Sequence, residues 1–296
     1  MEDKRMLFIV NPCAGQKKAA KALSDILAVF SREGWFPTVA FTQYSGHAAI
    51  IVESLAASGY SLVVCAGGDG TLNEVISGLR KANIDLPIGY LPCGTTNDLA
   101  STLELSKNPV QAAEDILSGK QIKLDLGSFN GRSFVYTASF GAFTNVSYGT
   151  PQSAKNALGH LAYVLEGARS LTQLKPIRAR ITADEVVYDG NYLLGSINNT
   201  TSLAGIIALD KAKVKLDDGK FEMLLINMPK NILEFNNIIA ELSQKRFDNM
   251  LSLVSASSFK IETDMPMDWT LDGELEKGST EFIIKNIAQA ITILVP

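Results

Sequence analysis

Residues 61–71 read Ser-Leu-Val-Val-Cys-Ala-Gly-Gly-Asp-Gly-Thr, an apolar run followed by three glycines and one acid. Such a run, with a helical pattern behind it over residues 71–81, predicts a strand, a tight turn and a helix. The glycines are expected to adopt positive φ and to let a ligand approach the backbone. A helix N-terminus that faces such a turn binds anions, most naturally phosphate.

Asp69 is unusual in a phosphate-binding turn, because a carboxylate repels phosphate unless a cation lies between them. It therefore indicates Mg²⁺ and a nucleoside triphosphate. On this stretch alone, a plain tight turn is the alternative. The P-loop pattern G-x-x-x-x-G-K-[ST] is absent and G-x-G-x-x-G is broken at Asn73, so neither a P-loop enzyme nor a dinucleotide dehydrogenase is indicated.

The composition is typical of an intracellular protein with reduced cysteines and two domains of ordinary size. The 296 residues are 46% hydrophobic, which is enough for sizeable cores, and the net charge of −4 argues against a nucleic-acid binder. The 3 cysteines lack metal-ligand spacing and are expected to be small packing residues in a reduced cytoplasm. We expect neither a signal peptide nor a transmembrane helix.

The first part of the chain alternates between strand and helix patterns. Strands are expected at residues 5–10, 36–42, 61–66 and 86–91, and helices at 17–33, 46–58 and 71–81. This alternation predicts a mostly parallel sheet with helices on both faces. Ligands bind beyond the carboxyl ends of such strands, where turns begin at Asn11, Gly67 and Pro92. Asn97 and Asp98 either cap the helix that starts there or contact the ligand.

The pattern changes after about residue 124 to short β-rich runs, which predict an antiparallel β-sandwich. The runs lie at residues 123–129, 133–140, 177–182, 192–198, 221–227, 258–262 and 282–287. Helices are expected at 154–172 and 232–245. The second has a stripe of Ile232, Phe235, Ile238, Ile239 and Leu242, which is expected to pack on the sheet, with a membrane-facing helix as the alternative. The final run, 290–295, is expected to return to the first domain.

Acidic residues in the second part are open to two interpretations. The stretches 215–219 and 271–274 each read as polar hairpin turns, although the carboxylates and carbonyls of the first could also hold a hard cation. Asp125 lies between two leucines, so its carboxylate needs either solvent or a partner.

Six stretches together resemble the diacylglycerol kinase catalytic family, which is related to sphingosine and ceramide kinases. They are NPCAG at 11–15, GGDGTLNE at 67–74, PCGTTND at 92–98, LDLG at 124–127, KLDDGKF at 215–221 and LDGE at 271–274, in the family's order. The resemblance implies an α/β plus all-β protein. Residues 1–126, completed by 288–296, are expected to form a three-layer αβα nucleotide-binding domain like those of NAD kinase and phosphofructokinase, and residues 127–287 a β-sandwich.

The resemblance also implies roles for single residues. The ATP site is expected to contain Asn11, Pro12, Cys13, Ala14, Gly15, Thr42, Gly67, Gly68, Asp69, Gly70, Thr71, Leu72, Asn73, Glu74 and Thr95. Asp69 is expected to act through Mg²⁺ and water, Glu274 to be the general base for the lipid hydroxyl, and Asp125 to support the acidic network of that site. Asp218, with the carbonyls of Lys215 and Lys220, is expected to hold a structural Mg²⁺. For Thr42, a strand-end or capping role is the alternative.

The implied function is ATP- and Mg²⁺-dependent transfer of phosphate to a lipid hydroxyl, most naturally that of diacylglycerol to give phosphatidic acid. The resemblance further implies a cytoplasmic protein that binds the membrane surface transiently, and a homodimer. Two alternatives stay open: an NAD kinase-like phosphotransferase, and a noncatalytic regulator that binds nucleotide or lipid. Retention of Asp69, Asp125 and Glu274 argues against the regulator.

Overall fold

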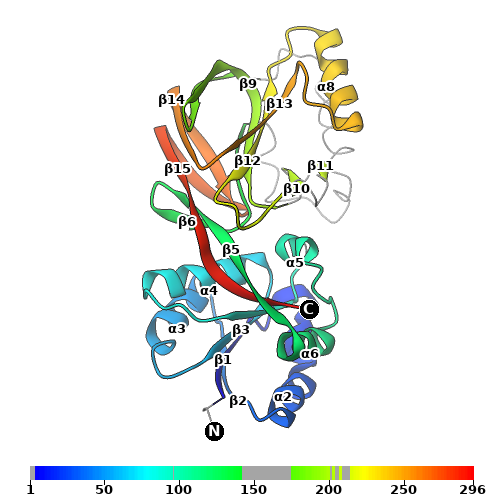
Figure 1. The fold of residues 1–296 in the computed structure, drawn as a ribbon, viewed down its shortest axis with the longest axis vertical. Coiled ribbons are helices and arrows are strands. Elements are labelled where there is room, and N and C mark those ends of the chain that lie inside the picture. The colour runs from blue at the N-terminus through cyan, green and yellow to red at the C-terminus, as the bar shows by residue number, and fades with distance from the viewer. Residues whose placement is uncertain (1–3, 96, 142–174, 201, 204–206, 209–213) are drawn as a thin grey trace. The chain divides into compact units, whose positions relative to one another are not determined.

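A computed structural model describes residues 4–95, 97–141, 175–200, 202–203, 207–208 and 214–296. The contacts within the chain divide it into two compact units (Figure 1). Unit 1 comprises Met1–Leu124 and Gln289–Pro296, and unit 2 comprises Asp125–Ala288. The helix expected at 154–172 lies outside the described residues.

Unit 1 is built on a parallel sheet. Its strands are β1 (Arg5–Val10), β2 (Phe36–Phe41), β3 (Leu62–Gly67) and β4 (Ile88–Pro92), paired in the order β4-β3-β1-β2. The end of β15 (Glu274–Val295) adds a further parallel strand through the pair Ile293–Ile88. The expected return of residues 290–295 to the first domain is therefore confirmed.

Helices cover both faces of this sheet (Figure 1). Met6, Phe8 and Val10 of β1 pack into one core with residues of α2 (Leu23–Arg32) and α6 (Pro109–Ser118). Alternate residues of a strand point to opposite faces, and on the other face lie α3 (His47–Leu55) and α4 (Asp69–Lys81). Gly78 permits close packing of these two helices, because a Cβ there would lie 2.7 Å from the carbonyl oxygen of Ala49.

The helix expected over residues 17–33 is broken into three pieces. A 3-10 helix, η1 (Ala14–Lys17), is followed by α1 (Lys18–Lys21) and then by α2, with non-helical angles at Ala22. Residues 15–17 all have positive φ. The periodicity of apolar residues carries no information on these backbone angles. The sequence pattern therefore predicted one continuous helix.

Unit 2 is built from antiparallel strands, as predicted. In the described residues they are β5 (Lys120–Phe129), which begins in unit 1, β6 (Arg132–Phe134), β7 (Thr137–Gly141), β8 (Ile177–Ala183), β9 (Val186–Asn198), β10 (Ser202–Leu203), β11 (Ile207–Ala208), β12 (Phe221–Asn227), β13 (Leu251–Ala256), β14 (Ser258–Leu271) and β15. The run 133–140 is divided between two strands, and β13 was not predicted. Both β7 and β8 pair with β9 and with β14, so these four strands close into a ring.

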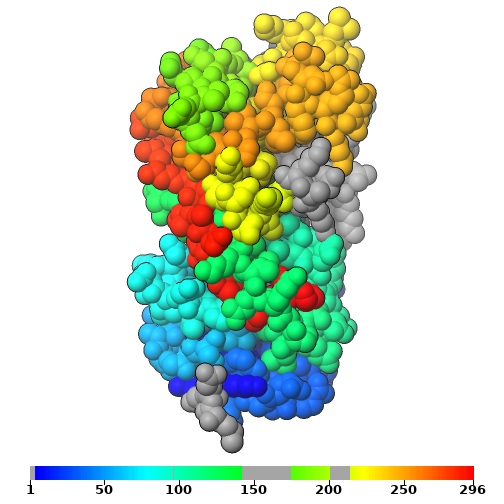
Figure 2. Space-filling model, viewed as in Figure 1, coloured from blue at the N-terminus to red at the C-terminus, as the bar shows by residue number. Residues whose placement is uncertain are grey.

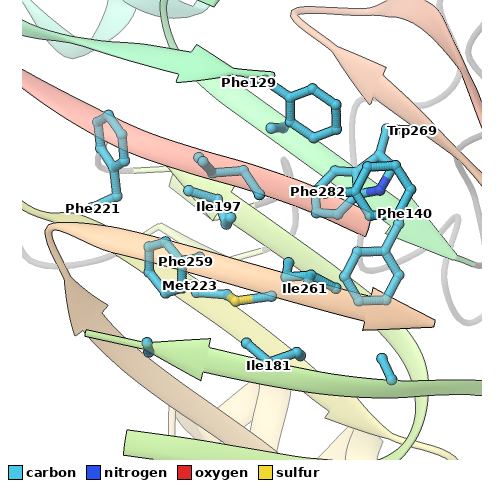
Figure 3. Packing of buried hydrophobic residues seen from close by; sticks show 14 of the residues in the cluster. Phe129, Phe140, Ile181, Ile197, Phe221, Met223, Phe259, Ile261, Trp269 and Phe282 are labelled. Carbon is cyan, nitrogen blue, oxygen red and sulfur yellow. The ribbon is translucent and has the colours of Figure 1, made fainter. Parts of the chain in front are cut away.

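Aromatic side chains fill the core of unit 2 (Figure 3). Phe129 lies over Trp269 and Phe282, with ring centroids 4.9 and 5.6 Å away. On the outside of the unit lies α8 (Ile232–Gln244; Figure 2). Its Ile238 and Leu242 pack on the sheet. The predicted stripe is wrong at its first member, because Ile232 is 59% exposed.

Candidate active site

Three turns meet at the carboxyl edge of the sheet in unit 1. The turn after β1 is joined to the turn after β3, because the Asn11 side-chain amide donates to the hydroxyl of Thr71 over 3.1 Å. The side-chain oxygen of Asn11 accepts the N–H of Cys13 at 3.0 Å. The turn after β4 is joined to β3 by the N–H of Cys93, which donates to Gly67 O at 2.7 Å.

Glycines in these turns allow the backbones to touch. A Cβ on Gly15 would lie 1.8 Å from the Cys93 carbonyl oxygen, and a Cβ on Gly94 would lie 2.5 Å from the Cα of Gly68. The expectation of positive φ in the GGDG turn is wrong: Gly68 is extended, with φ −95° and ψ −175°. A Cβ on Gly67 would instead lie 2.5 Å from the Cβ of Thr71, and one on Gly68 would lie 3.2 Å from the Cα of Gly94 in the neighbouring turn.

Asp69 is the first residue of α4, two residues earlier than the predicted helix start. Its Oδ2 accepts the N–H of Asp98 at 3.2 Å, whereas its Oδ1 is buried and makes no hydrogen bond. Burial raises the pKa of Asp69 above its ordinary value. Burial, together with the charge of Asp69, raises the pKa of Asp98 to about 6. Asp69 and Asp98 therefore form a pair of half-buried acids.

The sequence pattern indicated Asp98 only as a helix cap or a ligand contact. Its place beside Asp69 depends on two turns that are 29 residues apart in sequence. The cap interpretation of Asn97 is wrong in its detail, because Asn97 makes no side-chain cap bond to α5 (Asp98–Thr102). Its amide instead closes the preceding turn, with bonds of 2.9 Å to the N–H and the carbonyl of Gly94.

Two other residues expected in the ATP site, Glu74 and Thr42, make hydrogen bonds within the protein. Both carboxylate oxygens of Glu74 accept backbone N–H groups, from Gly46 at 2.7 Å and Ala48 at 3.0 Å, so Glu74 holds the start of α3. Thr42 is buried at the end of β2 and donates its N–H to Val10 O. Thr95 is exposed in the turn after β4. The ATP-site roles expected for these three residues stay predictions.

The cysteines do not all serve as packing residues. Cys65 and Cys93 are buried, and burial raises the pKa of Cys93 to about 11. Cys13 is exposed in the turn after β1, which corrects the prediction for that residue.

We expect a thiol-alkylating reagent at pH 7.5 to label Cys13 alone in the native protein, because burial keeps the other two thiols inaccessible and protonated. Mass spectrometry of peptides after brief alkylation would measure this. Cys13→Ser should abolish native labelling, and denaturant should restore two labelled sites in that variant. Rapid native labelling of Cys65 would contradict the packing seen here.

In unit 2, Asp125 is fully buried beside the Asp-Asp-Gly turn. Its Oδ2 accepts the N–H of Gly219 at 2.7 Å and the side-chain amide of Asn286 at 3.1 Å. The same amide of Asn286 donates to Lys220 O at 3.1 Å. Asp125 thus has the partners that its burial requires, and they join it to the Asp-Asp-Gly turn.

The Asp-Asp-Gly turn closes on itself. Oδ1 of Asp218 accepts the N–H of Lys220 at 3.1 Å, which is the hydrogen-bonded polar turn given above as one interpretation. No cluster of three or more His, Cys, Asp or Glu suited to a metal occurs among the described residues. The expected site uses one carboxylate and the carbonyls of Lys215 and Lys220, so it remains a prediction. The buried, unbonded Oδ1 of Asn286 lies next to this turn.

The Leu-Asp-Gly-Glu stretch forms the turn between β14 and β15. Asp272 and Gly273 both have positive φ, 48° and 88°, as the two-residue hairpin turn of type I′ requires. The buried carboxylate of Asp272 accepts the N–H groups of Val135 (2.6 Å), Tyr136 (3.0 Å) and Thr137 (3.0 Å). Glu274 opens β15 with a side chain that is 53% exposed and paired with Arg132. Neither Asp272 nor Arg132 was singled out from the sequence.

Glu222 is a further acid that the sequence pattern did not reveal. It is 8% exposed on β12, with Oε1 3.4 Å from the Ser255 hydroxyl and Oε2 without a hydrogen bond. Burial and then the charge of Asp218 raise the pKa of Glu222 to about 7.

This shift predicts a pH-dependent stability. The unfolded carboxyl loses its proton near pH 4.5 and the folded one near pH 7, so stability from this group is complete below pH 4.5 and lost as pH rises through 7. We expect Glu222→Gln to raise the unfolding free energy at pH 8 by roughly 2–3 kcal/mol. Urea denaturation in EDTA would measure it, and the gain should vanish at pH 4.5. An equal gain at both pH values would exclude titration as its cause.

Comparison with known proteins identifies the family. Residues 5–129 match the diacylglycerol kinase catalytic domain. A diacylglycerol kinase of Staphylococcus epidermidis is 32% identical over 295 residues, which cover 99% of this chain and 92% of that protein. The chain belongs to the diacylglycerol kinase family. The prediction that it is an enzyme of the lipid kinase class is confirmed.

Two further relatives agree with this assignment. A diacylglycerol kinase of Staphylococcus aureus strain MRSA252 is 30% identical over 295 residues, covering 99% of this chain and 93% of that protein. A crystal structure from Bacillus anthracis, provisionally named a diacylglycerol kinase, has a TM-score of 0.80 and 26% identity, and covers 100% of this chain and 98% of that one. The similarity extends over both units.

Proposed function

We propose that this protein transfers the γ-phosphate of ATP to the hydroxyl of diacylglycerol and thereby forms phosphatidic acid. The observation that carries the proposal is the meeting of three glycine turns, a helix N-terminus and an acid pair at one edge of the unit 1 sheet. The names of its relatives support the acceptor.

The N-terminus of α4 supplies free backbone N–H groups and the positive end of the helix dipole for the phosphates. The acid pair fits Mg²⁺, because the unbonded Oδ1 of Asp69 offers an oxygen ligand of the kind this ion prefers. Asp69 and Asp98 would hold the ion. When bound, Mg²⁺ neutralises charge on the phosphate oxygens during transfer.

Glu274 is the proposed general base for the acceptor. Its Oε2 is paired with Arg132, and we assign to its Oε1 the role of taking the hydroxyl proton. As the proton leaves, the acceptor oxygen forms a bond to the γ-phosphorus. The bond from that phosphorus to the β–γ bridging oxygen breaks, and ADP departs.

Transfer of labelled γ-phosphate from ATP with Mg²⁺ would test this function. We expect label in phosphatidic acid when the acceptor is diacylglycerol in mixed micelles, and none when the acceptor is NAD. Asp69→Asn should abolish transfer, and Asp25→Asn, an exposed acid on α2, should not. Label on NAD would favour the NAD kinase-like alternative. ATP binding without transfer to any lipid would favour the regulator.

A diacylglycerol acceptor requires that the protein reach a membrane surface, so we propose transient peripheral binding by a cytoplasmic enzyme. Among the described residues, no helix has the length and hydropathy needed to span a bilayer. Homodimerisation also remains a proposal. Sedimentation with vesicles and light scattering on the purified chain would measure the two properties separately.

A further inference from the structure

Arg132 bridges two glutamates at the start of β15. Its Nη2 lies 2.5 Å from Oε2 of Glu274, and its Nη1 lies 2.5 Å from Oε2 of Glu276. Because side chains two residues apart on a strand lie on the same face, the two carboxylates would repel each other without the guanidinium between them. Charge-assisted bonds of this forked kind fix geometry more firmly than single bonds do.

The element that carries Arg132 is itself anchored. Arg132 opens β6, directly after a two-residue turn in which Asn130 and Gly131 have φ of 48° and 88°. The N–H of Asn130 donates to Ile283 O at 2.9 Å, and the side-chain oxygen of Asn130 accepts the N–H of Ile283 at 2.8 Å. Asn130, the first residue of the turn, is therefore fixed to β15 by two hydrogen bonds.

Phe129, on the other side of this turn, adds an apolar anchor. Its ring contacts Trp269 of β14 and Phe282 of β15 in the buried aromatic core (Figure 3). The turn between β5 and β6 thus has little freedom to shift, and Arg132 reaches Glu274 from a fixed position. A mobile surface ion pair contributes little to stability. An arginine that is held in a fixed position can orient the carboxylate it binds.

We propose that Arg132 is a positioning residue for Glu274. It holds Oε2 of Glu274 and separates this carboxylate from Glu276, which leaves Oε1 of Glu274 to take the proton of the acceptor hydroxyl. The inference rests on the proposed role of Glu274 as general base. It adds that the base depends on Arg132, a residue of β6 that lies outside all six sequence stretches named above.

Steady-state kinetics of Arg132→Gln and Arg132→Lys would test this, with labelled ATP and diacylglycerol in mixed micelles. We expect Arg132→Gln to lower kcat by about 10- to 100-fold with KM for ATP unchanged, because a misplaced base affects the chemical step and not nucleotide binding. Arg132→Lys should lie between this variant and the original protein, since an ammonium cannot bridge two carboxylates as a fork does. Arg178→Gln removes a similarly exposed arginine paired with Asp189 and serves as the matched control, with kcat unchanged.

The decisive measurement is the double variant with Glu274→Gln. If Arg132 acts through Glu274, its substitution should change kcat by less than twofold once the carboxylate is gone. A fall of the same factor in both backgrounds would overturn the inference, as would an Arg132→Gln enzyme with kcat within twofold of the original. Melting temperatures must agree within a few degrees, so that lost folding is not counted as lost catalysis. Full activity of Glu274→Gln alone would instead overturn the proposed base, and this inference with it.

Discussion

Glu274→Gln is expected to lower kcat by roughly 100- to 10,000-fold, which is the usual contribution of a general base. Glutamine has nearly the same shape as glutamate but cannot take the proton from the acceptor hydroxyl. The side chain is 53% exposed, so we expect the fold to tolerate this substitution. Initial rates with saturating ATP and diacylglycerol would measure the loss.

KM for ATP should stay within about twofold, because the groups proposed to bind nucleotide lie in unit 1. Glu281→Gln is a suitable control: it makes the same chemical change on the same strand, at an exposed residue paired with Lys260. We expect that control to retain its kcat. A Glu274→Gln enzyme with more than a third of the original kcat would show that the hydroxyl proton leaves by another route.

Asp272→Ala is expected to destabilise the protein by roughly 3–5 kcal/mol, because it removes the acceptor of three backbone N–H groups at once. The N–H groups of Tyr136 and Thr137 are two of the three donors. Because Asp272 is only 6% exposed, water cannot freely replace its carboxylate as their acceptor. Alanine would also occupy a position with φ of 48°, which disfavours residues with a Cβ. Urea denaturation followed by tryptophan fluorescence would measure the loss, since Trp269 lies three residues away in the aromatic core.

Asp272→Asn distinguishes the loss of the hydrogen bonds from the strain of a positive φ. Asparagine tolerates positive φ in a type I′ turn and keeps one oxygen acceptor, so we expect a loss of about 1–2 kcal/mol. Asp268→Ala, on the same strand but at an exposed residue, should change stability by less than about 0.5 kcal/mol. If Asp272→Ala and Asp268→Ala unfold at the same urea concentration, the three bonds contribute nothing measurable.

Local sequence patterns predicted most of the elements of unit 1. The strand at 5–10 has the predicted bounds, and the parallel pairing follows from the alternation of strands with helices. The pattern also predicted that β12 covers residues 221–227. These predictions succeed because apolar periodicity and turn residues act over a few neighbouring positions. They failed at Lys17 and Ala22, whose non-helical backbone angles interrupt the helix expected over residues 17–33.

The sequence by itself determined which residues could carry the chemistry: the glycine turns, Asp69, and the acid after the hairpin turn. Only the tertiary structure decided how they are used. It placed Asp98 against Asp69, turned Glu74 toward the start of α3, closed Asp125 onto Gly219, and brought Arg132 to a glutamate 142 residues away in sequence. Hydrogen bonds and ion pairs act over about 3 Å in space. Which groups come within that distance depends on how distant strands pair, and no local pattern in the chain records it.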